Sequence, residues 1–227
     1  SIQNKTRRPI KKNFIAPTGK AISNQPGTTW CRFETTGPIP QILARAAVIL
    51  AREAWSYDSG HLLFAIPVDL RRHRTDLNST ANLTYSIYIE VNPGDSPDII
   101  AAEINSQLAA KNEGLLSPED ELFRFVPIRL ISRQARKIID TRHKNGSYSI
   151  SGFISNLGKI PVEKFPGNEF KVHKVWGIPP GIEYAPFATV LSGYRNKISI
   201  ILAAPKRLAT DGRLNRAARR LAAELNN

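Results

Sequence analysis

Residues 61–104 have the sequence HLLFAIPVDLRRHRTDLNSTANLTYSIYIEVNPGDSPDIIAAEI, and this stretch decides the expected fold. It begins with an apolar run, residues 61–68, whose length is typical of a buried strand. Residues 83–91 alternate polar and apolar side chains, as a strand with one face in water does. Ser96-Pro97-Asp98 then supplies a capping hydroxyl, a proline at the first helical position and an acid in the first turn, which predicts a helix. Strand, strand and helix in this order indicate an α/β fold.

The segments before this stretch extend the same pattern. Residues 28–36 alternate and contain many β-formers, which predicts a strand. Residues 39–55 carry apolar side chains at three-to-four spacing, which predicts an amphipathic helix. Residues 1–27 contain proline and glycine with little periodicity, so we expect a basic, extended lead-in there.

The segments after residue 104 are less regular. Ser117 is expected to start a second helical region, kinked at Pro127. The remaining predictions are strands at 148–154, 170–175, 188–191 and 198–203 and a closing helix after Asp211. We therefore expect an α/β (α+β) fold class with a mixed β-sheet covered by helices. A fold with regularly alternating strands and helices and an all-parallel sheet is not expected.

The formal net charge of +13 calls for a partner hypothesis. The basic side chains concentrate at the two ends of the chain, at Lys5, Arg7, Arg8, Lys11, Lys12 and Lys20 and at Lys206, Arg207, Arg213, Arg216, Arg219 and Arg220. Nucleic acid, an acidic carrier protein and a phosphate-bearing thioester would each use such a surface. Solvated charge with no partner is a fourth interpretation.

The sequence offers no metal-binding or cofactor-binding motif. None of the four histidines, His61, His73, His143 and His173, has a second His or Cys at metal-ligand spacing, so no zinc site is expected. There is also no nucleophile elbow, phosphate-binding loop or dinucleotide fingerprint. We interpret His61 as a core residue at the start of its strand and the single Cys31 as a packing residue.

The cellular setting is predicted from what the chain lacks. Its longest apolar stretch, residues 42–51, is interrupted by Arg45 and is too short to span a bilayer. The N-terminus has no apolar signal core, and one cysteine cannot form an internal disulfide. We therefore expect a cytoplasmic protein. The sequence contains no methionine, so a processed or trimmed product is expected.

Two segments carry the candidate site residues. In Pro67-Val68-Asp69-Leu70-Arg71, the arginine follows a buried strand. Its planar guanidinium group could bind a carboxylate through two hydrogen bonds at the sheet edge. The alternative is an ordinary surface arginine. In Ile154-Ser155-Asn156-Leu157-Gly158, the hydroxyl of Ser155 and the amide of Asn156 are polar contacts at a strand end. Gly158 there allows close backbone approach. The alternative is a turn with a side-chain-to-backbone hydrogen bond.

Taken in order, these motifs resemble a known family over residues 28–225. The series PVDLR, NLTYSIYIEV, GDSPDIIAAEI, ISNLG and WGIPPGIEYAP, followed by the closing helix, resembles the C-terminal lobe of nonribosomal peptide synthetase condensation domains and of chloramphenicol-acetyltransferase-like, CoA-dependent acyltransferases. Residues 1–27 resemble the segment that joins the two lobes. We therefore divide the chain into an inter-lobe segment, 1–27, and an acyltransferase-like C-terminal lobe, 28–227.

The resemblance implies a site in a tunnel between two lobes. In the family, a His-His-x-x-x-Asp-Gly motif on the N-terminal lobe supplies the base that activates an amine or hydroxyl for attack on an acyl-CoA or phosphopantetheine thioester. Arg71 would pair with the aspartate of that motif, and Ser155, Asn156 and Gly158 would line the tunnel. This chain contains no such motif, so no catalytic residue is expected in it.

Three hypotheses follow for function. The chain is the C-terminal lobe of an acyltransferase, natural-product condensation enzymes included, and needs an N-terminal lobe; or it is a non-catalytic domain that binds a carrier protein; or it is a basic nucleic-acid-binding protein. The first predicts an exposed apolar patch beside Arg71 and Ser155, where the tunnel wall would be. A buried intramolecular pair at Arg71 together with a polar face would count against it.

Overall fold

The computed structural model describes residues 13–73, 79, 81–114, 126–162, 172, 175–179 and 185–225. Six strands form one sheet: β1 (Thr28–Thr36), β2 (Leu62–Asp69), β3 (Thr84–Val91), β4 (Gly152–Lys159), β5 (Ala188–Tyr194) and β6 (Lys197–Pro205). The α-helices are α1 (Ile42–Trp55), α2 (Pro97–Ala109), α4 (Ile128–Asn145) and α5 (Arg213–Leu225), with short 3-10 turns at η1 (Leu70–His73), η2 (Asn112–Gly114) and η5 (Lys206–Leu208).

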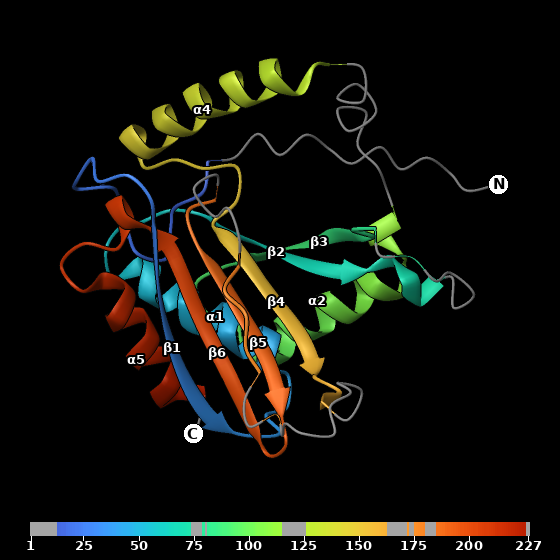
Figure 1. The fold of residues 1–227 in the computed structure, drawn as a ribbon. Helices are drawn as coiled ribbons and strands as arrows, with labels where there is room; N and C mark the ends of the chain where they lie inside the picture. Colours follow the sequence, from blue (N-terminus) through green and yellow to red (C-terminus); the bar gives the residue numbers. More distant parts are fainter. Residues whose placement is uncertain are drawn as a thin grey trace.

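The strand order is β1-β6-β5-β4-β2-β3. Strand β4 runs parallel to both β2 and β5, whereas the other neighbouring pairs are antiparallel. Figure 1 shows α1 and α5 behind the strands and α4 across one end of the sheet. The expected mixed sheet covered by helices is confirmed.

The sheet forks between β2 and β4. These two strands pair only at Phe64 with Gly152 and at Ala65 with Phe153. Beyond that point β2 stays paired with β3, while β4 stays paired with β5, so the two halves diverge (Figure 1). Residues that follow β2 and residues that follow β4 therefore lie on different branches of the sheet.

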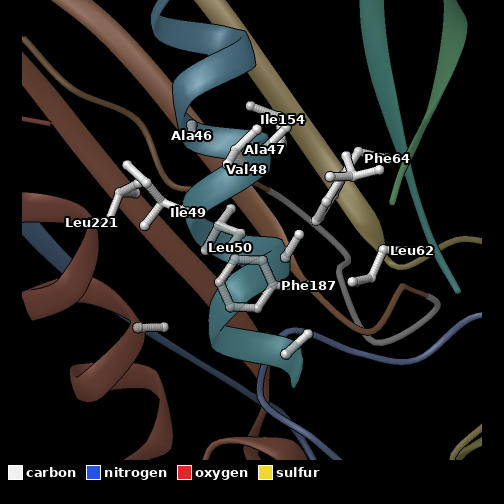
Figure 2. Packing of buried hydrophobic residues seen from close by; sticks show 14 of the residues in the cluster. Ala46, Ala47, Val48, Ile49, Leu50, Leu62, Phe64, Ile154, Phe187 and Leu221 are labelled. Carbon is white, nitrogen blue, oxygen red and sulfur yellow. The ribbon is translucent and has the colours of Figure 1, made fainter. Parts of the chain in front are cut away.

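The core lies between the sheet and the helices. Helix α1 is rich in alanine, and its residues from Ala46 to Ala51 are all buried. Small side chains let the helix approach the strands closely, so Leu62, Phe64 and Ile154 of the sheet pack on one side of it and Leu221 of α5 on another (Figure 2).

Several boundaries differ from the sequence-based expectations. Helix α1 begins at Ile42 rather than at residue 39, because a residue before a proline disfavours the helical region and Gln41 has a φ of 51°. Pro127 lies at the N-cap of α4 and does not kink it. Strand β4 begins at Gly152, since residue 148 forms only an isolated bridge to Phe14. The helical start at Ser117 and most of the strand 170–175 lie outside the described residues.

The part of the lead-in that the structure describes packs on the lobe. The backbone of Phe14 bridges both His61 and Tyr148, and Phe14 and Ala16 are buried. Arg213 Nη1 of α5 donates to the carbonyl oxygens of Thr18 (3.1 Å) and Lys20 (2.8 Å). These contacts tie the start of the described chain to its last helix.

Candidate active-site face

One face of the sheet carries the helices, and the opposite face, which we call the open face, carries a hollow. Alternation along β4 directs Ile154 toward α1 and directs Phe153, Ser155 and Leu157 to the open face. The hollow has a volume of about 730 Å³. Its described lining residues are Pro67, Ser149, Ile150, Phe153, Ser155, Leu157, Gly177, Ile178, Pro179, Ala185, Ala188, Thr189 and Val190.

The hollow is mainly apolar. The described part of its lining contains three hydroxyl residues and no charged side chain or histidine. Such a surface can enclose an apolar group and exclude water, but none of these lining residues can act as a general base.

Large apolar side chains on and around the open face are exposed. Leu157 is 58% exposed and Ile178 is 43% exposed, although both are aliphatic. The rings of Trp30 and Trp176 lie 5.4 Å apart, and the Arg32 guanidinium lies 5.3 Å above the Trp176 ring. Exposed apolar side chains beside a hollow are typical of an interaction site. The apolar surface was expected beside both Arg71 and Ser155; it is found beside Ser155, whereas Arg71 does not line the hollow.

The Arg71 guanidinium holds the turn that follows β2. Its Nη1 donates to Asp69 Oδ1 at 3.0 Å, and its Nη2 donates to the carbonyl oxygens of Ser79 (3.0 Å) and Ala81 (2.6 Å). Hydrogen bonds from Arg71, the backbone N–H first among them, lower the pKa of Asp69. The Arg71 side chain is nevertheless 33% exposed, so this pair is not a buried one.

The Ser155–Gly158 segment is divided between the two faces of the sheet. Ser155 lines the hollow together with Pro67. Asn156 lines a separate hollow of about 410 Å³ beside Gln41 at the start of α1, and its Oδ1 accepts the backbone N–H of Gly158 at 2.9 Å. Within the described residues no contact joins Arg71 to this segment, because the fork separates the two strand ends.

The histidines do not gather at the hollow. His61 is more than half exposed and lies 3.4 Å from Glu90, so its interpretation as a core residue is wrong: β2 begins one residue later. His73 Nε2 lies 2.9 Å from Oε1 of the buried Glu113, and the buried His143 Nδ1 lies 3.1 Å from the Tyr148 hydroxyl. His173 lies outside the described residues. The described chain contains no cluster of three metal-ligating side chains.

Much of the basic C-terminal end is engaged within the lobe. Arg216 Nε donates to the Tyr57 hydroxyl at 3.0 Å, and Arg220 Nη1 lies 3.3 Å from Oε2 of the buried Glu53. With Arg213 on the lead-in carbonyls, these side chains fasten α5 to α1 and to the start of the chain. Their charge therefore serves the fold rather than an open docking surface.

Cys31 packs against the core on the helix side of β1, as expected for a structural cysteine. Burial raises the pKa of its thiol from 9.0 to about 11. The folded state thus holds the thiol proton more tightly than the unfolded chain does. The cysteine therefore contributes a decrease in the free energy of unfolding as pH rises from about 9 to about 11.

Slow reaction of the Cys31 thiol with thiol reagents is the consequence. At pH 8 the thiolate fraction should be about a hundredfold below that of an ordinary thiol, because only the thiolate reacts. Reaction with a disulfide reagent, followed by absorbance in native buffer and in denaturant, measures the difference. Equal rates under the two conditions would show that the thiol is not protected.

The sequence and the structure were compared with known proteins. No protein-family model matches the sequence, and no curated protein matches it. Among solved structures, the condensation domain that mediates chain release from the enacyloxin polyketide synthase is 18% identical, with a TM-score of 0.53. The match covers 94% of this chain and 44% of that chain.

Two further structures have similar scores. A starter condensation domain of rhizomide synthetase, in complex with C8-CoA and Leu-SNAC, is 11% identical with a TM-score of 0.54, over 94% of this chain and 48% of that one. A probable dihydrolipoamide acetyltransferase from Listeria monocytogenes is 11% identical with a TM-score of 0.51, over 88% of this chain and 84% of that one.

These comparisons define the fold class. The chain spans about half the length of the condensation domains that it matches. It has the fold of one lobe of a chloramphenicol-acetyltransferase-like architecture, the fold of condensation domains. At these identities the likeness shows the fold alone. Within the described residues, no helix combines the length and the apolar character needed to cross a membrane.

Proposed function

We propose that this chain is the C-terminal lobe of an acyltransferase or condensation-type enzyme. The enzyme would transfer an acyl or aminoacyl group from a thioester, on CoA or on a carrier protein, to an amine or hydroxyl. The observation that carries the proposal is the open face, where exposed apolar side chains surround a hollow of about 730 Å³ on the side of the sheet without α1. An N-terminal lobe placed there would cover this surface and close the hollow into a tunnel.

The proposed division of labour follows from the lining of the hollow. Its apolar wall would hold the acyl chain and exclude water, with the Ser155 hydroxyl as a polar contact. A histidine of the N-terminal lobe would accept the proton of the acceptor amine or hydroxyl as that group attacks the thioester carbonyl. Collapse of the tetrahedral intermediate breaks the carbon–sulfur bond, and the leaving thiolate takes up the proton from the histidine.

Arg71 would connect the two lobes. A guanidinium has five N–H donors, and the contacts within the described residues use one on Nε, one on Nη1 and both on Nη2. The second N–H of Nη1 remains for a carboxylate of the other lobe, which is the aspartate of the proposed His-His-x-x-x-Asp-Gly motif. Arg71 would thus hold its own turn and position the catalytic loop at the same time. Asn156 and Gly158 would shape the end of β4 behind the tunnel wall.

A second candidate function is a non-catalytic domain that binds a carrier protein. The absence of a general base among the described lining residues of the hollow favours it. Nucleic-acid binding remains the third candidate, supported only by the net charge of +13.

Native mass analysis of everything that purifies with this chain from its natural source distinguishes the candidates. We expect a second polypeptide, or an extension of this one, that carries the double-histidine motif. A homogeneous species of 25.2 kDa, or an oligomer of it alone, would contradict the proposal.

In the two-lobe protein, Arg71→Ala is expected to lower acyl transfer by about a hundredfold, because small displacements of catalytic groups have effects of that size. Arg71→Lys keeps the positive charge but lacks the planar guanidinium group with its several N–H donors, so it should restore little of the activity. Acyl transfer from a thioester to an amine, followed by thiol release, is the measurement. Unchanged activity in Arg71→Ala would remove Arg71 from the site.

A further inference from the structure

Helix α4 carries a cationic strip. Arg129, Arg133, Arg136 and Lys137 recur at spacings of three and four residues, and together they line one shallow hollow on the outer side of the helix. The helix also contains Arg142 and Lys144 and one acid, Asp140, which lines the same hollow. The separation of eight residues between Arg129 and Lys137 corresponds to about 12 Å along a helix axis.

The charges of the strip have no carboxylate partner among the residues that the structure describes. None of its four cations makes an ion pair with a carboxylate of the described residues. Asp140 is engaged by Arg207 of η5 at 3.3 Å. Like charges four residues apart destabilise a helix by about 0.2–0.5 kcal/mol for each pair. The repulsion within two such pairs, Arg129–Arg133 and Arg133–Lys137, therefore opposes folding of α4. An anionic partner would relieve this repulsion.

A second hollow continues the strip toward the body of the lobe. It has a volume of about 330 Å³ and lies between α4 and the turn after β6. Its lining includes Arg136, His143 and Arg207 and the carboxylate of Asp140. Because Asp140 already pairs with Arg207, the cation of the strip that faces this hollow is Arg136.

An apolar side chain accompanies the strip. Leu130 is about half exposed and lies next to Lys137 on the helix surface, seven residues before it, whereas the equally exposed Ile138 lies on another side of the helix. α4 itself carries no aromatic residue on which a nucleobase could stack. Arginines at helical spacing beside an exposed aliphatic residue match a surface that has carboxylates and apolar side chains at the same spacing.

We propose that the α4 strip is a docking surface for an acidic amphipathic helix of a partner protein. Carboxylates of that helix would contact Arg129, Arg133 and Lys137, while its apolar residues would cover Leu130. The proposal goes beyond the pairing of lobes and does not depend on it, because it rests on α4 and not on the open face.

A labelled helical peptide tests the proposal with the full chain. The probe is a 21-residue peptide with glutamate and leucine at helical spacing. A disordered peptide with the same number of glutamates but glycine and serine in place of leucine is the first comparison, and a 20-base-pair RNA duplex is the second. We expect the amphipathic peptide to bind more tightly than either comparison, with an affinity that falls as salt rises. Tighter binding of the duplex or of the disordered peptide would overturn the proposal.

Variants with matched charge locate the surface. Arg133→Glu together with Lys137→Glu is expected to weaken peptide binding by about tenfold or more. Lys111→Glu together with Arg219→Glu makes the same change in net charge on exposed residues of other elements, and should weaken it by less than about threefold. Equal losses in the two double variants would show that binding follows net charge rather than α4. Leu130→Ser should also reduce binding, whereas Ile138→Ser on another side of α4 should not. No loss in Leu130→Ser would overturn the amphipathic part of the proposal.

Discussion

Leu157→Glu is expected to weaken the binding of this chain to its N-terminal lobe by about 30-fold or more. Leu157 is 58% exposed, lines the hollow on the open face and would become buried when that face is covered. Central apolar contacts of an interface often contribute about 2 kcal/mol or more, and a carboxylate there would also have to be desolvated. Titration calorimetry of the two separated lobes, or native mass analysis of the nicked protein, gives the affinity.

The same substitution should leave the isolated chain intact. Exposed positions usually change the free energy of unfolding by less than about 0.5 kcal/mol, so the denaturation midpoint of Leu157→Glu should match that of the parent. Ile99→Glu is the matched control: Ile99 is 55% exposed, but it lies in the first turn of α2 and does not line the hollow of the open face. It should have no effect on lobe binding.

Two results would change the assignment of the open face. Equal effects of Leu157→Glu and Ile99→Glu on lobe binding would show that the interface lies elsewhere. Dissociation of a homo-oligomer by Leu157→Glu would make a second copy of this chain the occupant.

The sequence predicted the central elements because their signals are local. Alternation in residues 84–91 and the Ser96-Pro97-Asp98 start of α2 both need only neighbouring residues, and the Ser96 hydroxyl accepts the Ile99 N–H as a cap should. Residues 61–68 were expected to be a buried strand; the strand observed is Leu62–Asp69, and its first five residues are buried.

The candidate site could be predicted only in part, because the fork is not a local feature. The position where β2 and β4 separate depends on pairing between residues about 88 apart in sequence, as in the bond from Leu63 N–H to Ser151 Oγ. Without that pairing, Arg71 and Ser155 could not be assigned to separate branches. Phe153, Val190 and Ile178, which line the hollow, look like ordinary core residues in the sequence.

The positions of basic residues in the sequence did not show which of their charges are available to a partner. The two basic ends suggested one docking surface, but Arg213, Arg216 and Arg220 are engaged by internal carbonyl, hydroxyl and carboxylate oxygens. Among the described residues, the cations without a carboxylate partner include Arg129, Arg133, Arg136 and Lys137 of α4, in the middle of the chain. Tertiary contacts, which composition does not contain, decide which arginines are engaged.

Phe64→Ala is expected to destabilise the lobe by about 3–5 kcal/mol, the usual cost of removing a buried phenylalanine side chain. Phe64 is fully buried, packs in the core beside α1 (Figure 2) and forms one of the two residue pairs that join β2 to β4. Thermal and denaturant unfolding measure the loss, and the melting temperature should fall by roughly 10 °C for a chain of this size.

Phe153→Ala is the control that tests whether the loss of stability comes from the core side of the junction between β2 and β4. Phe153 is one step along the same junction, where it pairs with Ala65, but it points to the open face and is only half-buried. It should lose about half as much stability, because less area returns to water and the remaining cavity opens to solvent. In the two-lobe protein the order should reverse for activity: Phe153→Ala alters the tunnel wall directly, whereas Phe64→Ala acts only through folding. If Phe64→Ala instead costs no more than Phe153→Ala, the junction is held by backbone pairing and not by the core beneath it.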